Sequence, residues 1–298
     1  MTPPADGSAL PSPEPAREGR VMQKLLWPRH ADQIAANGTS HVFGPVVAAA
    51  DIEAITDPAA LLDAYGLTEI APYGPEPTHV DVLRYRAAPL MRHEVPNRQP
   101  VPRPWPQHEL GFLRTRLAVV PVWTLDTTRV PAGTQMWRLS GDDEQLLSVF
   151  QGPAAGWARV PSWSPPFVYA GPRAEWHGRE WVADFGAEDR SFVELVAFGE
   201  APDGFTPARP GVSHRMVPRT ECDRLFTVDL RHRWRGVPGR LLHAWGQIGI
   251  LRLDDDDPET AVRVGAWSPE PGVFEVQVAL ADLQEGTVPS TAFELPAP

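Results

Sequence analysis

The chain has 298 residues, of which 42% are hydrophobic and 22% are charged, and its formal net charge at pH 7 is -11. These proportions are ordinary for a globular protein, and the length allows two or three domains. The excess of carboxylates repels phosphate groups, so the charge argues against nucleic acids and anionic membranes as partners. No stretch reaches the roughly 20 apolar residues of a membrane helix, and the N-terminus has no apolar signal core.

The cysteine and histidine content argues against disulfides and metal sites. Cys222 is the only cysteine, so no intrachain disulfide can form, and we expect a cytoplasmic protein in which this thiol packs rather than reacts. The nine histidines show no metal-ligand spacing, and the sequence has no P-loop, no G-x-G-x-x-G and no G-x-S-x-G motif. We therefore expect neither a metal nor a cofactor.

The abundance of proline and tryptophan indicates the fold class. Thirty-five prolines and eleven tryptophans disfavour long helices and favour short strands joined by ordered loops. We predict a mainly β protein with an α+β N-terminal region and two tandem small SH3-like β-barrels at the C-terminus. The predicted division is a disordered tail over 1–21, an α+β domain over 22–160, a linker over 161–172, barrels over 173–228 and 229–290, and a tail over 291–298.

The helical signals lie early in the chain. Asp57 can cap a helix that begins at Pro58, and Gly66 stands where that helix would end. Strand patterns follow: apolar residues alternate over 80–85, and two strand-like runs over 134–150 flank a turn. The N-terminal half is therefore predicted to combine short helices with a hairpin-containing sheet.

The last third of the chain contains an internal repeat. Trp176 and Trp234 each open a Trp-x-Gly turn, 58 residues apart, and strand-like runs follow both turns in the same order. A unit of this size closes most easily as a barrel, because closure removes exposed strand edges. Coincidence is the alternative interpretation, since Trp-x-Gly fixes only two residues.

The candidate binding residues are aromatic and acidic. Exposed tryptophans on a barrel would form a groove for a peptide, whereas Trp176 and Trp234 are expected in the cores. The acidic run over 254–257 lacks the EF-hand spacing and its glycine, so we expect a solvated loop that contacts a basic partner rather than a calcium site. The candidate protein-binding residues are Trp245, Trp267, Asp254, Asp255, Asp256 and Asp257.

Three stretches carry a family resemblance. The runs over 80–85, 119–123 and 130–138, together with the two Trp-x-Gly turns, resemble uncharacterised actinobacterial proteins, some of which are associated with polymorphic toxin and type VII secretion neighbourhoods. The resemblance implies an accessory role, such as an immunity protein that binds and blocks a basic toxin. It assigns no catalytic residue.

Two function classes follow from the sequence. The first is a non-enzymatic protein-interaction protein, in the form of an immunity or accessory factor. The alternative is a toxin-type enzyme acting on a nucleotide cofactor within 22–160, with Arg84, His93 and Glu94 as polar candidates, although such residues are more often structural. A third reading, a small-ligand or peptide binder with an aromatic groove, is weakened by the lack of an export signal.

Overall fold

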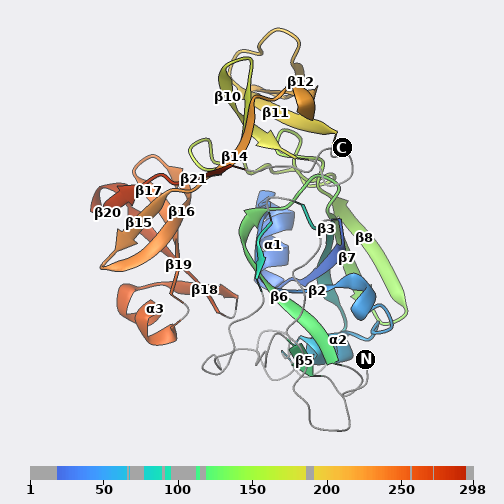
Figure 1. The fold of residues 1–298 in the computed structure, drawn as a ribbon. Helices are drawn as coiled ribbons and strands as arrows, with labels where there is room; N and C mark the ends of the chain where they lie inside the picture. Colours follow the sequence, from blue (N-terminus) through green and yellow to red (C-terminus); the bar gives the residue numbers. More distant parts are fainter. Residues whose placement is uncertain are drawn as a thin grey trace.

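The computed structural model describes residues 19–65, 67, 77–88, 91–94, 112–114, 119–185, 191–255, 257–270 and 272–292. The described chain is mainly β, as predicted, and forms three antiparallel sheets (Figure 1). None of the helices in these ranges combines the length and the apolar character that a crossing of the bilayer requires.

The first sheet comes from the N-terminal half and has the strand order β4-β6-β2-β1-β3-β7-β8, with β5 paired to β6. Its strands are β1 (Val21–Leu25), β2 (His41–Ala48), β3 (Val80–Arg86), β4 (His93–Glu94), β5 (Phe112–Arg114), β6 (Val119–Arg129), β7 (Gln135–Ser140) and β8 (Asp143–Val149). The predicted strand over 80–85 and the predicted hairpin over 134–150 are confirmed as β3 and as the β7–β8 pair.

Short helices cover both faces of this sheet. Helix α1 (Pro28–Asn37) packs on one face and α2 (Pro58–Ala64) on the other, while η1 (Ala49–Asp51) is a single turn after β2. The predicted cap is confirmed: Asp57 Oδ1 accepts a hydrogen bond from the backbone N–H of Ala60 at 2.8 Å. The predicted helix end at Gly66 lies outside the described residues. Coverage of both faces explains why the central strands β1, β2 and β3 are buried along nearly their whole length.

The other two sheets come from the C-terminal half. The second sheet contains β9 (Gly171–Trp176), β10 (Arg179–Asp184), β11 (Phe192–Phe198), β12 (Thr206–Arg209), β13 (Val212–Pro218), β14 (Arg224–Val228) and β21 (Ser290–Ala292). The third contains β15 (Arg231–Trp234), β16 (Val237–Trp245), β17 (Ile248–Leu253), β18 (Trp267–Glu270), β19 (Val273–Ala279) and β20 (Gln284–Thr287). Three short helices join these strands, namely η2 (Arg219–Glu221), α3 (Pro258–Val264) and η3 (Leu280–Asp282).

The second and third sheets share one strand order. The second runs β12-β13-β11-β10-β9-β14, followed by β21, and the third runs β18-β19-β17-β16-β15-β20. With β9 matched to β15 and the later strands matched in turn, the two orders are identical. Both Trp-x-Gly turns place two residues in the left-handed region, with φ of 53° and 68° at His177 and Gly178, and 49° and 82° at Arg235 and Gly236. This is the geometry of a tight hairpin turn.

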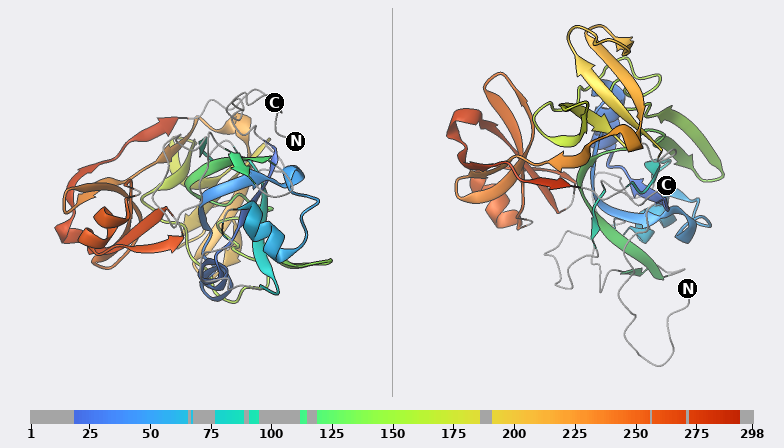
Figure 2. Two further views of the ribbon diagram at one scale, coloured as in Figure 1. Left: turned by 90° about the horizontal axis from the view of Figure 1, so that it is seen from below. Right: turned by 45° about the horizontal axis from the view of Figure 1, so that its top comes forward.

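The barrel form is not confirmed. The strand pairing of the described residues leaves each of the three sheets open, so no SH3-like barrel is closed. The chain also returns after the third sheet, because β21 pairs with β14 of the second sheet and takes up Thr291 and Ala292 from the predicted tail. Figure 2 shows the third sheet, in orange to red, set to one side of the first in both views.

Charged side chains join the third sheet to the first. Lys24 Nζ of β1 lies 2.9 Å from Glu270 Oε2 of β18, and the two side chains are 4% and 1% exposed. Arg252 of β17 lies over the ring of Phe43 and donates to the hydroxyl of Thr127 at the end of β6. The contact between these sheets is therefore built from buried cations of both sheets.

Candidate functional site

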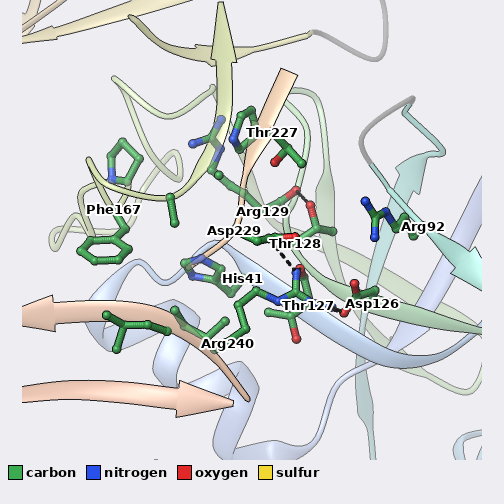
Figure 3. Close-up of a pocket in the computed structure, with 16 residues that line it drawn as sticks. His41, Arg92, Asp126, Thr127, Thr128, Arg129, Phe167, Thr227, Asp229 and Arg240 are labelled. Atoms are coloured by element: carbon green, nitrogen blue, oxygen red, sulfur yellow. Dashed lines mark hydrogen bonds and ion pairs between the residues drawn. The ribbon is translucent and has the colours of Figure 1, made fainter. Parts of the chain in front are cut away.

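A hollow of about 70 Å³ lies where the three sheets meet (Figure 3). One wall is apolar and includes Phe167 and Leu241, and the other is polar. The polar wall includes His41, Arg92, Asp126, Thr227, Asp229 and Arg240. Sites for small molecules usually measure about 300–1,000 Å³. The hollow therefore suits one side chain of a partner better than a nucleotide.

Arg240 forms ion pairs with both carboxylates of the hollow. Its guanidinium reaches from β16 to Asp126 on β6, and its Nη1 donates to Asp229 Oδ1 at 3.4 Å. Its single positive charge is shared between Asp126 and Asp229, and Asp229 Oδ2 also lies 4.0 Å from Arg231 Nη2.

Two further groups of the hollow are less engaged. Arg92 is exposed and its Nη2 donates to the Thr291 hydroxyl at 3.3 Å, but no carboxylate among the described residues forms an ion pair with it. Burial, together with the nearby Arg129 and His243, lowers the pKa of His41 to about 3, so its ring is neutral. Within the described chain, neither nitrogen of that ring has a hydrogen-bond partner.

An aromatic row continues from the apolar wall of the hollow onto the surface. We define the aromatic row as Tyr169, Phe167, His243 and Trp245. Successive ring centroids are 5.6, 5.7 and 5.7 Å apart, which places each ring against the next. Phe167 is buried, whereas Tyr169 is 68% and Trp245 is 46% exposed.

A bulge in β16 turns the row outward. Leu241 pairs with the buried Leu251, yet His243 pairs with the adjacent Ile250, so Leu242 is an extra residue in the strand. An extra residue shifts the alternation of side chains between the two faces. His243 and Trp245 therefore lie on the opposite face of the sheet from Leu241, away from the core.

The acidic run over 254–257 is largely used for local structure. Arg231 Nη1 lies 2.8 Å from Asp254 Oδ1, and Asp255 accepts a hydrogen bond from the backbone N–H of Asp257 at 2.9 Å. Asp257 caps α3 through the hydroxyl and backbone N–H of Thr260, and these hydrogen bonds lower the pKa of its carboxyl. Asp256 lies outside the described residues.

The structure does not bring the predicted binding residues together. Trp245 pairs with Ile248 at the start of β17, whereas Asp254 follows the end of that strand. Trp267 is half-buried and pairs with Glu275, which lies near the acidic end of the sheet. Trp245 thus stands at one end of the third sheet, and Trp267 and the acidic run stand at the other.

The polar candidates of the enzyme hypothesis also lie apart. Arg84 Nη1 and Nη2 each donate to Glu144 at 2.8 Å, and Nε donates to Gln23 at 2.9 Å. His93 lies 3.1 Å from the Tyr85 hydroxyl, and burial lowers its pKa to about 4. Arg84 and Tyr85 are consecutive in β3, so their side chains point to opposite faces of the sheet. The side chain of Glu94 is not described.

A larger cavity, of about 340 Å³, is lined in part by the Arg84–Glu144 pair. The pair satisfies both charges, and the Arg84 hydrogen bonds lower the pKa of Glu144, which makes that carboxylate a poor base. Its other lining residues supply one exposed carboxylate, Glu53, and no nucleophile. The cavity offers volume but little catalytic chemistry.

Sequence reasoning missed a buried acidic centre in the second sheet. Glu194 Oε1 lies 2.8 Å from His214 Nδ1, with Asp184 and Arg129 nearby. Burial and then the charge of Asp184 raise the pKa of Glu194 to about 8, against the opposing effect of Arg129. These residues come from four different strands, so no local motif could indicate them.

Metal and thiol chemistry find no centre in the described ranges. No group of three or more His, Cys, Asp or Glu residues there could hold a metal ion. Burial raises the pKa of the half-buried Cys222 thiol to about 11, so little thiolate forms near neutral pH.

No protein-family model, curated protein or solved structure matches the chain.

Proposed function

We propose that this protein is a non-enzymatic protein-binding protein and that the aromatic row is its contact surface. The observation that carries the proposal is the contact of the exposed Trp245 and Tyr169 with Phe167 and His243 in one continuous set of rings. Scattered exposed apolar residues are normal, but contiguous ones indicate an interaction site. Tryptophan and tyrosine also dominate binding hot spots.

The toxin-type enzyme has less support. Its candidates Arg84 and His93 face opposite sides of the first sheet, and each is engaged in hydrogen bonds. The hollow beside the aromatic row is too small for a nucleotide, at about 70 Å³. An immunity or accessory role in the cytoplasm is the particular form of the binding proposal that the family resemblance favours.

We also propose that the second and third sheets are two copies of one SH3-like unit. Their identical strand order, the matching left-handed turns at Gly178 and Gly236, and a short 3-10 turn before β14 and β20 support this proposal. A duplication would give two sheets with the same strand order, and the third sheet is the copy that carries the aromatic row.

Selection of binders tests the proposed function. Short random peptides displayed on phage are selected on the full chain, and their affinities are measured for wild type and for the double variant Trp245→Ala, Tyr169→Ala. We expect a loss of at least about tenfold in the double variant, because both rings of the contact surface are removed. Val262→Ala on α3 is the control, since Val262 is 79% exposed but lies outside the row.

The outcome separates the row from other surfaces. Peptides that bind the double variant as tightly as wild type would overturn the proposal, and so would the absence of any selected peptide. Asp254→Asn in the same assay measures the contribution of the acidic run, which the sequence predicts to contact a basic partner.

A further inference from the structure

We propose that the hollow beside the aromatic row accepts an acidic side chain of the protein partner, with Arg92 as its ion-pair partner. This inference rests on the proposed function and specifies the chemistry of the segment that binds. The net charge of -11 led us to expect a basic partner from the sequence. The inference instead places an acidic residue in the segment that binds.

The hollow and the aromatic row form one surface. Phe167 belongs to both, and its ring contacts Tyr169 on one side and His243 on the other. Figure 3 shows Phe167 and Arg92 on opposite sides of the hollow, with Arg240 and Asp126 between them. A segment lying on the row could therefore place one side chain in the hollow and reach Arg92.

The charges of the hollow favour an anion. Asp126 and Asp229 are both paired with Arg240, and Arg129 is directed to Ala183 and Asp184 of the second sheet. Arg92 is thus the lining cation that has no carboxylate partner among the described residues. A lysine or arginine from a partner would meet the positive charge of Arg92, whereas a carboxylate would pair with it.

Hydrogen-bond donors without acceptors also favour a carboxylate in the hollow. The Nε–H groups of Arg129 and Arg240 are buried and lack acceptors in the described part of the chain. The neutral ring of His41 can donate one further hydrogen bond, as can the hydroxyl of Thr227. A carboxylate has two oxygens and no hydrogens, so it can accept from His41 and Thr227 without bringing a donor that needs a partner, whereas the buried Nε–H groups are reached only after a side-chain movement.

The size of the hollow limits what enters. A cavity of about 70 Å³ has room for a small group such as a carboxylate and its waters, but not for a nucleotide. The rest of the bound segment would then lie over the exposed rings of Tyr169 and Trp245. The fitting partner segment therefore carries Asp or Glu next to apolar or ring-containing residues.

Peptide selection on charge variants tests the inference. The same random library is selected on wild type, on Arg92→Glu and on Arg263→Glu, a control that makes the same charge change on the exposed face of α3. We expect Asp or Glu at one fixed position in wild-type and control binders, and Lys or Arg at that position in Arg92→Glu binders. Binding of the wild-type peptides to Arg92→Glu should fall at least about tenfold, and more at low salt.

The outcomes distinguish this inference from the proposed function. Peptides that need Trp245 and Tyr169 but show no acidic preference, or that ignore Arg92→Glu, would overturn the inference and leave the binding function standing. Peptides that ignore the aromatic row would overturn both. Circular dichroism of each variant confirms that it is folded before its selection is interpreted.

Discussion

The second and third sheets have the same strand order but use their outer faces differently. In the second sheet the face opposite its core packs against Ala154 and Trp163 and buries Glu194. In the third sheet the bulge at Leu242 turns His243 and Trp245 toward the surface. Two sheets with the same strand order can therefore expose different faces, because one extra residue in a strand changes which side chains point to the surface.

The largest effect is expected where the third sheet is attached to the first. Lys24→Ala leaves Glu270 as a buried carboxylate without its ion-pair partner, so we expect a loss of about 3–5 kcal/mol in the free energy of unfolding. Urea denaturation of wild type and variant measures this loss. The double variant Lys24→Met, Glu270→Leu removes both charges and should lose much less; an equal loss in both variants would contradict the buried-charge explanation.

The two Trp-x-Gly turns give the next comparison. Trp176 is 8% exposed in the second core, whereas Trp234 is half-buried and donates from Nε1 to the Val264 carbonyl at 3.1 Å. Trp176→Ala should therefore cost about 3–5 kcal/mol of stability and Trp234→Ala distinctly less. Thermal and urea unfolding of both variants test this, and equal losses would show that the two turns are packed alike.

The buried acid of the second sheet should make the stability of the protein depend on pH. The pKa of Glu194 is raised from 4.5 to about 8 in the folded protein, so the native state keeps a proton that the unfolded state releases. Stability from this group is complete below about pH 4.5 and falls by about 1.4 kcal/mol per pH unit until about pH 8. Asp184, Arg129 and His214 surround the carboxyl.

Glu194→Gln should remove this slope, because the amide stays neutral at every pH. Unfolding free energies measured from pH 5 to pH 8 give the difference between wild type and variant. Glu175→Gln on the exposed part of β9 is the matched control, since its side chain is 40% exposed. A wild-type slope unchanged by Glu194→Gln would contradict the raised pKa.

Local patterns predicted local structure well. The cap at Asp57, the alternation that became β3 and the β7–β8 hairpin depend on neighbours in the sequence, and the structure confirms them. The strand-like runs predicted after each Trp-x-Gly turn also form strands, namely β10 and β11 in the second sheet and β16 and β17 in the third. Closure into barrels was not confirmed, because closure depends on pairing between distant edges that periodicity does not encode.

The candidate site depended on contacts that the sequence does not show. Trp245 was a predicted binding residue, but Phe167 and Tyr169 lay in a predicted linker with no pattern to connect them to β16. The bulge at Leu242 reverses the alternation from which faces are predicted. Arg92 meets Thr291 across 199 residues of sequence, a distance over which residue patterns carry no information.

The return of the chain through β21 restricts how the third sheet can move. The chain leaves the second sheet at Val228 and rejoins it at Ser290, which pairs with Val228 itself. Strands β15 to β20 thus form an excursion whose entry and exit are adjacent and hydrogen-bonded. Exchange of strands β15 to β20 between two molecules would require the chain to separate from the second sheet at both Val228 and Ser290. The pairing of β14 with β21 therefore opposes domain-swapped dimers.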